Sequence, residues 1–308
     1  MIELQRLLMG DRIRNAAFER ALKKVIVPGV SIVADIGSGT GFLSFLASKL
    51  GAKQCYLYEV TDVLKLSREI AKENGIKNFV FIQKHSTEVK SPPKVDIVLG
   101  EVLGNFALEE NIIETLRDAK RFLKPGGVMI PQALTQYVAP VTNDRLWNEI
   151  NIWDDVGFGL SFDAARNVTL ENMYVKDVRP EDLASGKNSV QIFDEIDFAV
   201  KNASQRTSTI EWKDLQGTIY GFAVWWEALL VPGVHLSTSP MTEPTHWKQI
   251  FLPALSPLEL RAGDHLELTI ESDSRYHVRI NLVWKILQRR GGKIVAEQDM
   301  DMRKGHID

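Results

Sequence analysis

Hydrophobic and polar positions follow two different rhythms along the 308-residue chain. Residues 3–25 carry apolar side chains at helical spacing, which predicts one amphipathic helix. From Ser31 to Pro131, short apolar runs alternate with helical stretches. This alternation is typical of a parallel sheet with helices on both faces. The pattern predicts strands at 31–36, 54–59, 78–83, 94–99 and 127–131, and helices at 41–50, 62–74 and 109–123.

The pattern changes after Pro131, so we place a domain boundary there. Beyond residue 190 apolar and polar residues alternate with period two, at 218–226, 265–270 and 277–284, and Arg290-Gly-Gly-Lys293 indicates a hairpin. We therefore expect an antiparallel sandwich or barrel. Residues 145–185 fit neither rhythm. Their aromatic side chains have no periodicity that suits either core, which predicts an inserted arm; they are Trp147, Trp153, Phe158 and Phe162.

Composition and charge restrict the class of protein. With 44% hydrophobic and 25% charged residues, the chain resembles a soluble globular protein, and a net charge of −3 gives no footprint for nucleic acid. No apolar run reaches membrane-spanning length, and the charged N-terminus predicts no secretory signal. The single cysteine, Cys55, excludes internal disulfides and suits a reducing cytoplasm. The histidines show no metal-ligand spacing, so we expect no metal.

A glycine-rich turn follows the first predicted strand. Gly37, Gly39 and Gly41 alternate before a helical stretch, an arrangement that directs backbone N–H groups and a positive helix end toward one ligand. Because position 42 is Phe, the spacing differs from that of dinucleotide binders. Asp35, just before the turn, would repel a pyrophosphate but could accept from an amine or hydroxyl. An α/β turn without a ligand is the alternative.

Acidic residues gather at the expected carboxyl ends of the strands. Glu59 ends the second strand, where an acid can bind a ribose diol. Glu101 and Glu110 lie nine positions apart in a loop after the fourth strand, and two carboxylates can hold both sides of a planar guanidinium. Acids at a helix start are the alternative, which we favour for Glu109. The pattern alone also favours solvated surface roles for two N-terminal charges, Asp11 and Arg14.

These motifs resemble those of the protein arginine N-methyltransferase family. The family's glycine motif is similar to Val33–Gly41, its double-acid loop to Gly100–Glu110, and its N-terminal helix to Leu8–Arg14. Its threonine-histidine-tryptophan loop is similar to residues 237–249, which include Thr245-His246-Trp247. The likeness covers nearly the whole chain in the same order.

The resemblance implies a Rossmann-like S-adenosylmethionine methyltransferase domain over residues 1–131. It further implies an antiparallel β-barrel domain over 132–308, whose arm at 145–185 forms a homodimer. The reaction would be methyl transfer to the guanidinium nitrogen of arginine, in proteins or peptides. Glu101 and Glu110 would clamp the guanidinium, and His246 would pair with Asp11. Around the cofactor the resemblance places Arg14 at the carboxylate, Asp35, Gly37 and Gly39 at the methionine, Glu59 at the ribose, and Ser86 and Thr87 at the adenine.

The sequence departs from the family pattern in three places. Residues 1–50 contain no tyrosine, although the family has an aromatic lid helix. Asn105 and Glu109 stand at usually aromatic positions, and Thr87 aligns with the usual acid at the adenine. Two further hypotheses therefore stay open: a methyltransferase acting on a small-molecule guanidine or amine, and a cofactor-binding scaffold without turnover.

Overall fold

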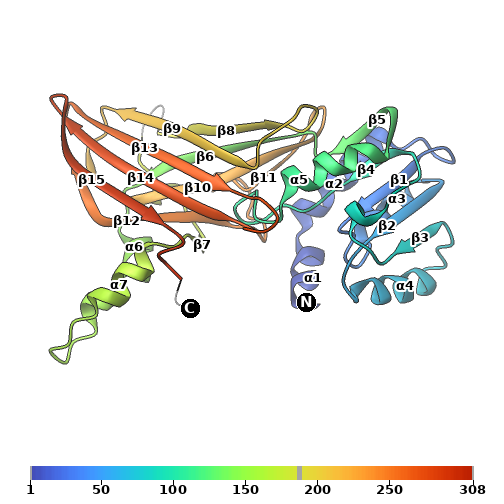
Figure 1. Cartoon of the computed structure of the whole chain (residues 1–308), viewed down its shortest axis with the longest axis horizontal. Helices are drawn as coiled ribbons and strands as arrows, with labels where there is room; N and C mark the ends of the chain where they lie inside the picture. The colour runs from blue at the N-terminus through green and yellow to red at the C-terminus, as the bar shows by residue number, and fades with distance from the viewer. Residues whose placement is uncertain (1, 186–188, 307–308) are drawn as a thin grey trace.

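The computed structural model describes residues 2–185 and 189–306 and contains a parallel sheet and a larger antiparallel barrel, seen at opposite ends of Figure 1. Two N-terminal helices, α1 (Ile2–Gly10) and α2 (Arg12–Val25), lie between them. α2 packs against α3 (Phe42–Lys49) on the sheet side and against two barrel strands on the other. Because α2 packs on both sides, one continuous cluster of buried apolar residues extends through the parallel-sheet half and the barrel.

The parallel sheet has the strand order β3-β2-β1-β4-β5. Its strands are β1 (Ile32–Ile36), β2 (Gln54–Tyr58), β3 (Phe79–Ile82), β4 (Val95–Leu99) and β5 (Leu123–Ile130), and its further helices are α4 (Val63–Glu73), η1 (Ser86–Glu88), α5 (Ile112–Ala119) and η2 (Lys120–Phe122). All neighbouring strands pair in parallel. The order reverses beside β1, and ligands of such sheets bind at the carboxyl ends of the strands at this point.

The antiparallel half consists of two sheets. One has the order β7-β12-β10-β6-β8 with β11 beside β10, and the other has the order β15-β14-β13-β9. The strands are β6 (Ala133–Val141), β7 (Tyr174–Lys176), β8 (Gln191–Asp197), β9 (Gln205–Lys213), β10 (Gly217–Val231), β11 (Val234–Ser237), β12 (Gln249–Leu260), β13 (Asp264–Asp273), β14 (Asn281–Arg290) and β15 (Lys293–Asp301). The expected hairpin joins β14 to β15 through Gly291 and Gly292.

Two helix predictions were wrong in detail. The expected helix over 3–25 is broken at Asp11, whose side chain accepts from Arg14 N and begins α2 as its N-cap. The helix expected at 109–123 is α5, which begins only at Ile112, because Asn111 adopts a left-handed conformation with φ 57°. Glu109 therefore lies in the loop before the helix and is not a helix-start acid.

Within the segment 145–185, helices α6 (Arg145–Ile150) and α7 (Asp163–Leu170), with η3 (Ile152–Asp155) between them, form an arm that projects from the barrel (Figure 1). The segment also contains β7, which pairs with β12 in the barrel, and η4 (Pro180–Asp182), so it is less irregular than expected. The prediction for Trp147 was wrong, because this side chain is buried and donates to Ala254 O at 2.9 Å. Phe158, in the loop between η3 and α7, is 95% exposed.

Candidate active site

The glycine turn is shaped by contacts with the strand beside it. Gly37 N and Ser38 N both donate to Tyr58 O at the end of β2. Gly37, Gly39 and Gly41 all have positive φ, between 53° and 84°, which other residues rarely adopt. A side chain at Gly37 would come within 3.1 Å of Val102. The turn therefore leaves room only for backbone at the cavity wall.

Two predicted carboxylates flank this turn. Asp35 is buried and accepts from Ser44 Oγ at 2.7 Å, and burial raises its pKa to about 6. Glu59 accepts from Gly39 N at 3.0 Å and from Thr61 N at 2.8 Å. Since a carboxylate has about four lone-pair sites, Glu59 retains capacity for ligand hydroxyls.

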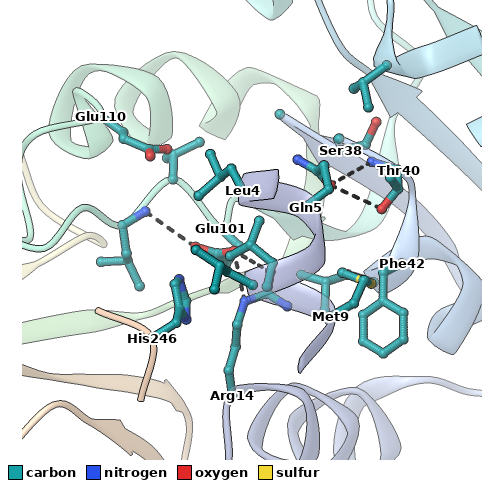
Figure 2. Close-up of a pocket in the computed structure, with 18 of the residues that line it drawn as sticks. Leu4, Gln5, Met9, Arg14, Ser38, Thr40, Phe42, Glu101, Glu110 and His246 are labelled. Atoms are coloured by element: carbon teal, nitrogen blue, oxygen red, sulfur yellow. Dashed lines mark hydrogen bonds and ion pairs between the residues drawn. The ribbon is translucent and has the colours of Figure 1, made fainter. Parts of the chain in front are cut away.

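Helix α1 lies across the glycine turn (Figure 2). Gln5 Oε1 accepts from both the backbone N and the Oγ1 of Thr40, each at 3.2 Å. Four apolar side chains of α1, Leu4, Leu7, Leu8 and Met9, line the same cavity. An aliphatic helix thus lines one side of the cavity beside the glycine turn.

The first acid of the loop after β4 contacts an arginine of α2. Arg14 Nε donates to Glu101 Oε2 at 3.0 Å, and Arg14 Nη2 forms an ion pair with the same oxygen. The side chains of Arg14 and Glu101 are only 4% and 9% exposed. The pattern-based hypothesis that Arg14 is a solvated surface charge was therefore wrong. Breaking a buried pair from one side leaves an unpaired charge, so each residue depends on the other.

The second acid of the loop lies apart from this pair (Figure 2). Burial, together with the charges of Glu101 and Glu109, raises the pKa of Glu110 to about 7. Its neighbour Glu109 turns back instead and accepts from Phe106 N at 3.0 Å. Burial also raises the pKa of Glu109. Both acids line the cavity, but Glu109 is held by the backbone of its own loop.

Side chains of the barrel hold the acidic loop. Trp226 Nε1 donates to Gly104 O at 3.1 Å, and Trp247 Nε1 donates to Leu103 O at 2.6 Å. In return, Asn105 Nδ2 donates to Trp247 O at 2.5 Å. These contacts satisfy backbone carbonyls that a buried loop would otherwise leave unpaired. The position of both acids consequently depends on the barrel.

Asp11 and His246 pair across the two halves, as the resemblance implies. Asp11 Oδ2 lies 2.7 Å from His246 Nδ1 and accepts from His246 N at 2.9 Å. Burial alone would raise the pKa of Asp11, but the hydrogen bonds from His246 and Arg14 outweigh it and lower the pKa. The carboxylate is therefore stabilised in its ionised form.

These residues surround a cavity of ≈ 530 Å³, which a second compartment of ≈ 240 Å³ adjoins. Ser38 lines the larger compartment and Ser86 lines the smaller one. The Oγ atoms of both serines are buried and have no hydrogen-bond partner in the described ranges. A glycine cradle, unpaired buried hydroxyls and several acids fit a cationic nucleoside ligand such as S-adenosylmethionine. Thr87 lies in neither compartment and contacts His85 instead. No metal-binding group of acids, histidines or cysteines occurs in residues 2–185 and 189–306.

Comparison with known proteins decides the family. Residues 132–288, just over half of the chain, match the model of the arginine methyltransferase oligomerization subdomain, and residues 30–156 match that of a methyltransferase domain. The chain belongs to the arginine methyltransferase family. No helix of this arginine methyltransferase, within the part that the structure describes, is long and apolar enough to cross a membrane.

Individual relatives agree with this assignment. The chain is 27% identical to "Probable protein arginine N-methyltransferase 6.1" of Oryza sativa subsp. indica, over 88% of this chain and 81% of that protein. It is 26% identical to the histone-arginine methyltransferase CARMER of Anopheles gambiae, over 98% of this chain and 51% of that one. Its fold is similar to that of Trypanosoma brucei PRMT1 in an enzyme-prozyme heterotetrameric complex with AdoHcy, with a TM-score of 0.83, 24% identity and coverage of 97% and 98%. The predicted fold class, family and methyltransferase activity are confirmed.

Sequence reasoning missed two residues of this site and the contact of a third. Gln5 and Trp226 each contact a loop at the cavity, but neither belongs to a motif. Asn105 was noted only as a departure from the family pattern, and its hydrogen bond to Trp247 O was not predicted. Trp226 appeared only as one apolar position of a strand pattern. The contacts join residues up to 142 positions apart, a separation that no local pattern reveals.

Proposed function

We propose that this enzyme transfers methyl groups from S-adenosylmethionine to the guanidinium nitrogen of arginine in proteins or peptides. One observation carries the proposal: a single barrel-held loop presents Glu101 and Glu110 to a cavity that the glycine turn also lines. When bound, S-adenosylmethionine supplies an activated methyl group on a sulfonium. The two acids would hold the guanidinium by charge-assisted hydrogen bonds and draw positive charge from the attacking nitrogen.

We propose cofactor contacts for the residues predicted from the sequence. Glu59 would take the ribose hydroxyls, and Asp35 would lie beside the methionine part. Arg14 would contact the cofactor carboxylate while it remains beside Glu101, so one guanidinium would position groups in both halves of the cavity. The other predicted contacts are Gly37, Gly39, Ser86 and Thr87; Thr87 would need a different side-chain position because it now contacts His85.

The domain roles follow from the same proposal. Residues 1–131 would bind the cofactor, and residues 132–308 would hold the acidic loop and the substrate. His246 and Asp11 would act as an orienting or proton-relay pair at their junction.

A cytoplasmic location suits the buried, unpaired Cys55.

The test is single-turnover methyl transfer to an arginine-bearing substrate identified in lysate with labelled cofactor. We expect Glu101→Gln and Glu110→Gln each to lower the rate on the order of a hundredfold, since each lost charge lets the guanidinium tilt. Binding of S-adenosylhomocysteine by the Glu110→Gln variant should stay near that of the wild type. Glu88→Gln, an exposed acid outside both compartments, is the matched control.

Melting temperatures must accompany these rates, because Glu101→Gln also removes the counter-charge of buried Arg14. If folded variants of both acids keep wild-type rates, the guanidinium assignment fails. Labelled metabolites in place of labelled protein would favour the small-molecule hypothesis. Cofactor binding without any labelled product would favour the scaffold.

We also propose a homodimer formed through the arm. The family match over residues 132–288 is to an oligomerization subdomain, and Phe158 and Leu160 in the loop between η3 and α7 are 95% and 64% exposed. Exposed apolar side chains of this kind usually cover a partner surface. Wild-type chain should sediment as a dimer at micromolar concentration, and a Phe158→Ser, Leu160→Ser double variant should shift toward monomer. A monomeric wild type would contradict the proposal.

A further inference from the structure

The smaller compartment has one wall that the barrel supplies. It shares Gly37, Glu59, Val102 and Glu110 with the main cavity, so the two compartments adjoin at the same edge of the parallel sheet. One of its lining residues, Tyr276, comes from the loop between β13 and β14. No motif in the sequence pointed to this residue.

Tyr276 is held in place by the first turn of α5. Its backbone N donates to Glu114 Oε2 at 3.1 Å, and its hydroxyl lies 3.3 Å from Thr115 Oγ1. Asn111 Nδ2 donates to Ser274 O at 2.8 Å in the same loop. Since α5 follows Glu110 directly, this barrel loop is fixed beside the cavity.

The compartment combines aromatic surface with unpaired polar atoms. The rings of His85 and Tyr276 meet edge to face, with centroids 5.8 Å apart and an interplanar angle of 82°. Ser86 Oγ and Tyr58 OH, which also line the compartment, are buried and have no hydrogen-bond partner within residues 2–185 and 189–306. A flat aromatic base with hydrogen-bonding edges matches this lining, because its ring can pack on a side-chain ring while its edge pairs with the hydroxyls.

We infer that Tyr276 is a further cofactor-binding residue, whose ring forms the wall against which the adenine of S-adenosylmethionine packs. This inference rests on the proposed function. Tyr276 is 40% exposed, so a base against it would cover apolar ring surface that water now contacts. The barrel would then contribute to cofactor binding as well as to the position of the acidic loop.

Calorimetry on the full chain tests this inference with two ligands, S-adenosylhomocysteine and 5′-methylthioadenosine, which share the adenosine but differ in the amino-acid part. Tyr276→Ala should weaken binding of both to the same degree, on the order of tenfold, as expected for a lost base–aromatic contact. Tyr276→Phe keeps the ring and should bind as the wild type does. His277→Ala, an exposed change in the same loop, is the control.

The outcomes separate this inference from the proposed function. Wild-type affinity in a folded Tyr276→Ala variant overturns the inference and leaves the proposed function standing. Equal losses in Tyr276→Phe and Tyr276→Ala also overturn it, because they assign the effect to the hydroxyl contact with Thr115. A wild-type chain that binds neither ligand overturns the proposed function itself. Melting temperatures show that each variant is folded.

Discussion

The glycine turn and the acidic loop line the same cavity, but different parts of the chain hold them. Backbone N–H groups of the turn donate to Tyr58 O and to the Glu59 side chain, about twenty positions away at the end of the adjacent strand. The acidic loop takes its bonds from Trp226 and Trp247 in the barrel, 122 and 144 positions away. The proposed cofactor binding through the turn would therefore depend on the parallel sheet alone, whereas the geometry of the acids depends on the two halves together.

The largest expected effect comes from removing one hydrogen bond between the barrel and the acidic loop. Trp226→Phe deletes the donor to Gly104 O at a fully buried position, which should shift the acidic loop and lower turnover on the order of ten- to a hundredfold. Affinity for S-adenosylhomocysteine, measured by calorimetry, should change little because the glycine turn is untouched.

Trp284→Phe provides the matched control for that change. Trp284 is equally buried, and its Nε1 donates to Pro253 O inside the barrel, far from the acidic loop in sequence. Both variants should lose about 1–3 kcal/mol of unfolding free energy from the unpaired carbonyl. Only Trp226→Phe should lose turnover. Equal losses of turnover would mean that general barrel stability sets the rate.

The pH dependence of kcat/KM tests the acidic loop separately from the glycine turn. Because the pKa of Glu110 is raised to about 7, its carboxylate is mostly protonated at pH 6 and mostly ionised at pH 8. Arginine stays protonated throughout this range. We expect the ionisation of Glu110 to raise kcat/KM about tenfold between pH 6 and 8. Glu110→Gln should keep only a rise of about twofold over this range, because Asp35, whose pKa is about 6, is half protonated at pH 6. The same slope in both enzymes would assign the titration elsewhere.

The smallest expected effect concerns stability at the junction of the halves. Asp11→Asn keeps an N-cap acceptor for α2 but removes the charge paired with His246, and should lower the unfolding free energy by about 1–2 kcal/mol at pH 7. Since the folded-state pKa of Asp11 is lowered, its stabilisation is present above the ordinary pKa of 3.8 and is lost as pH falls through the folded-state pKa. Urea titrations should show a large difference in unfolding free energy between variant and wild type at pH 7, and a small difference at pH 3.

The sequence predicted the parts of the site that follow from local pattern. All five strands of the parallel sheet, the glycine turn and the acids at the strand ends were recognisable, because periodicity and spacing determine them. The break at Asp11 was missed, since an N-cap inside an amphipathic pattern leaves the apolar periodicity nearly intact. Trp147 was misassigned for the opposite reason: its pattern is irregular, yet tertiary packing buries it. The contacts of Trp226, Asn105 and Tyr276 depend on how the halves meet, which the sequence pattern does not encode locally.

The pairing of Asp11 with His246 has a consequence for how the chain is made. The two residues are 235 positions apart, and α2 packs on β10 and β11. During synthesis the parallel sheet is complete when residue 130 has emerged, but the start of α2 has no histidine partner until residue 246 follows. A ribosome-bound chain that ends before this point has a complete glycine turn, but it lacks the side of the cavity that His246 and Trp247 form. The cavity can therefore be closed only after residue 246 has been made, although its wall from the parallel sheet is translated well before that residue.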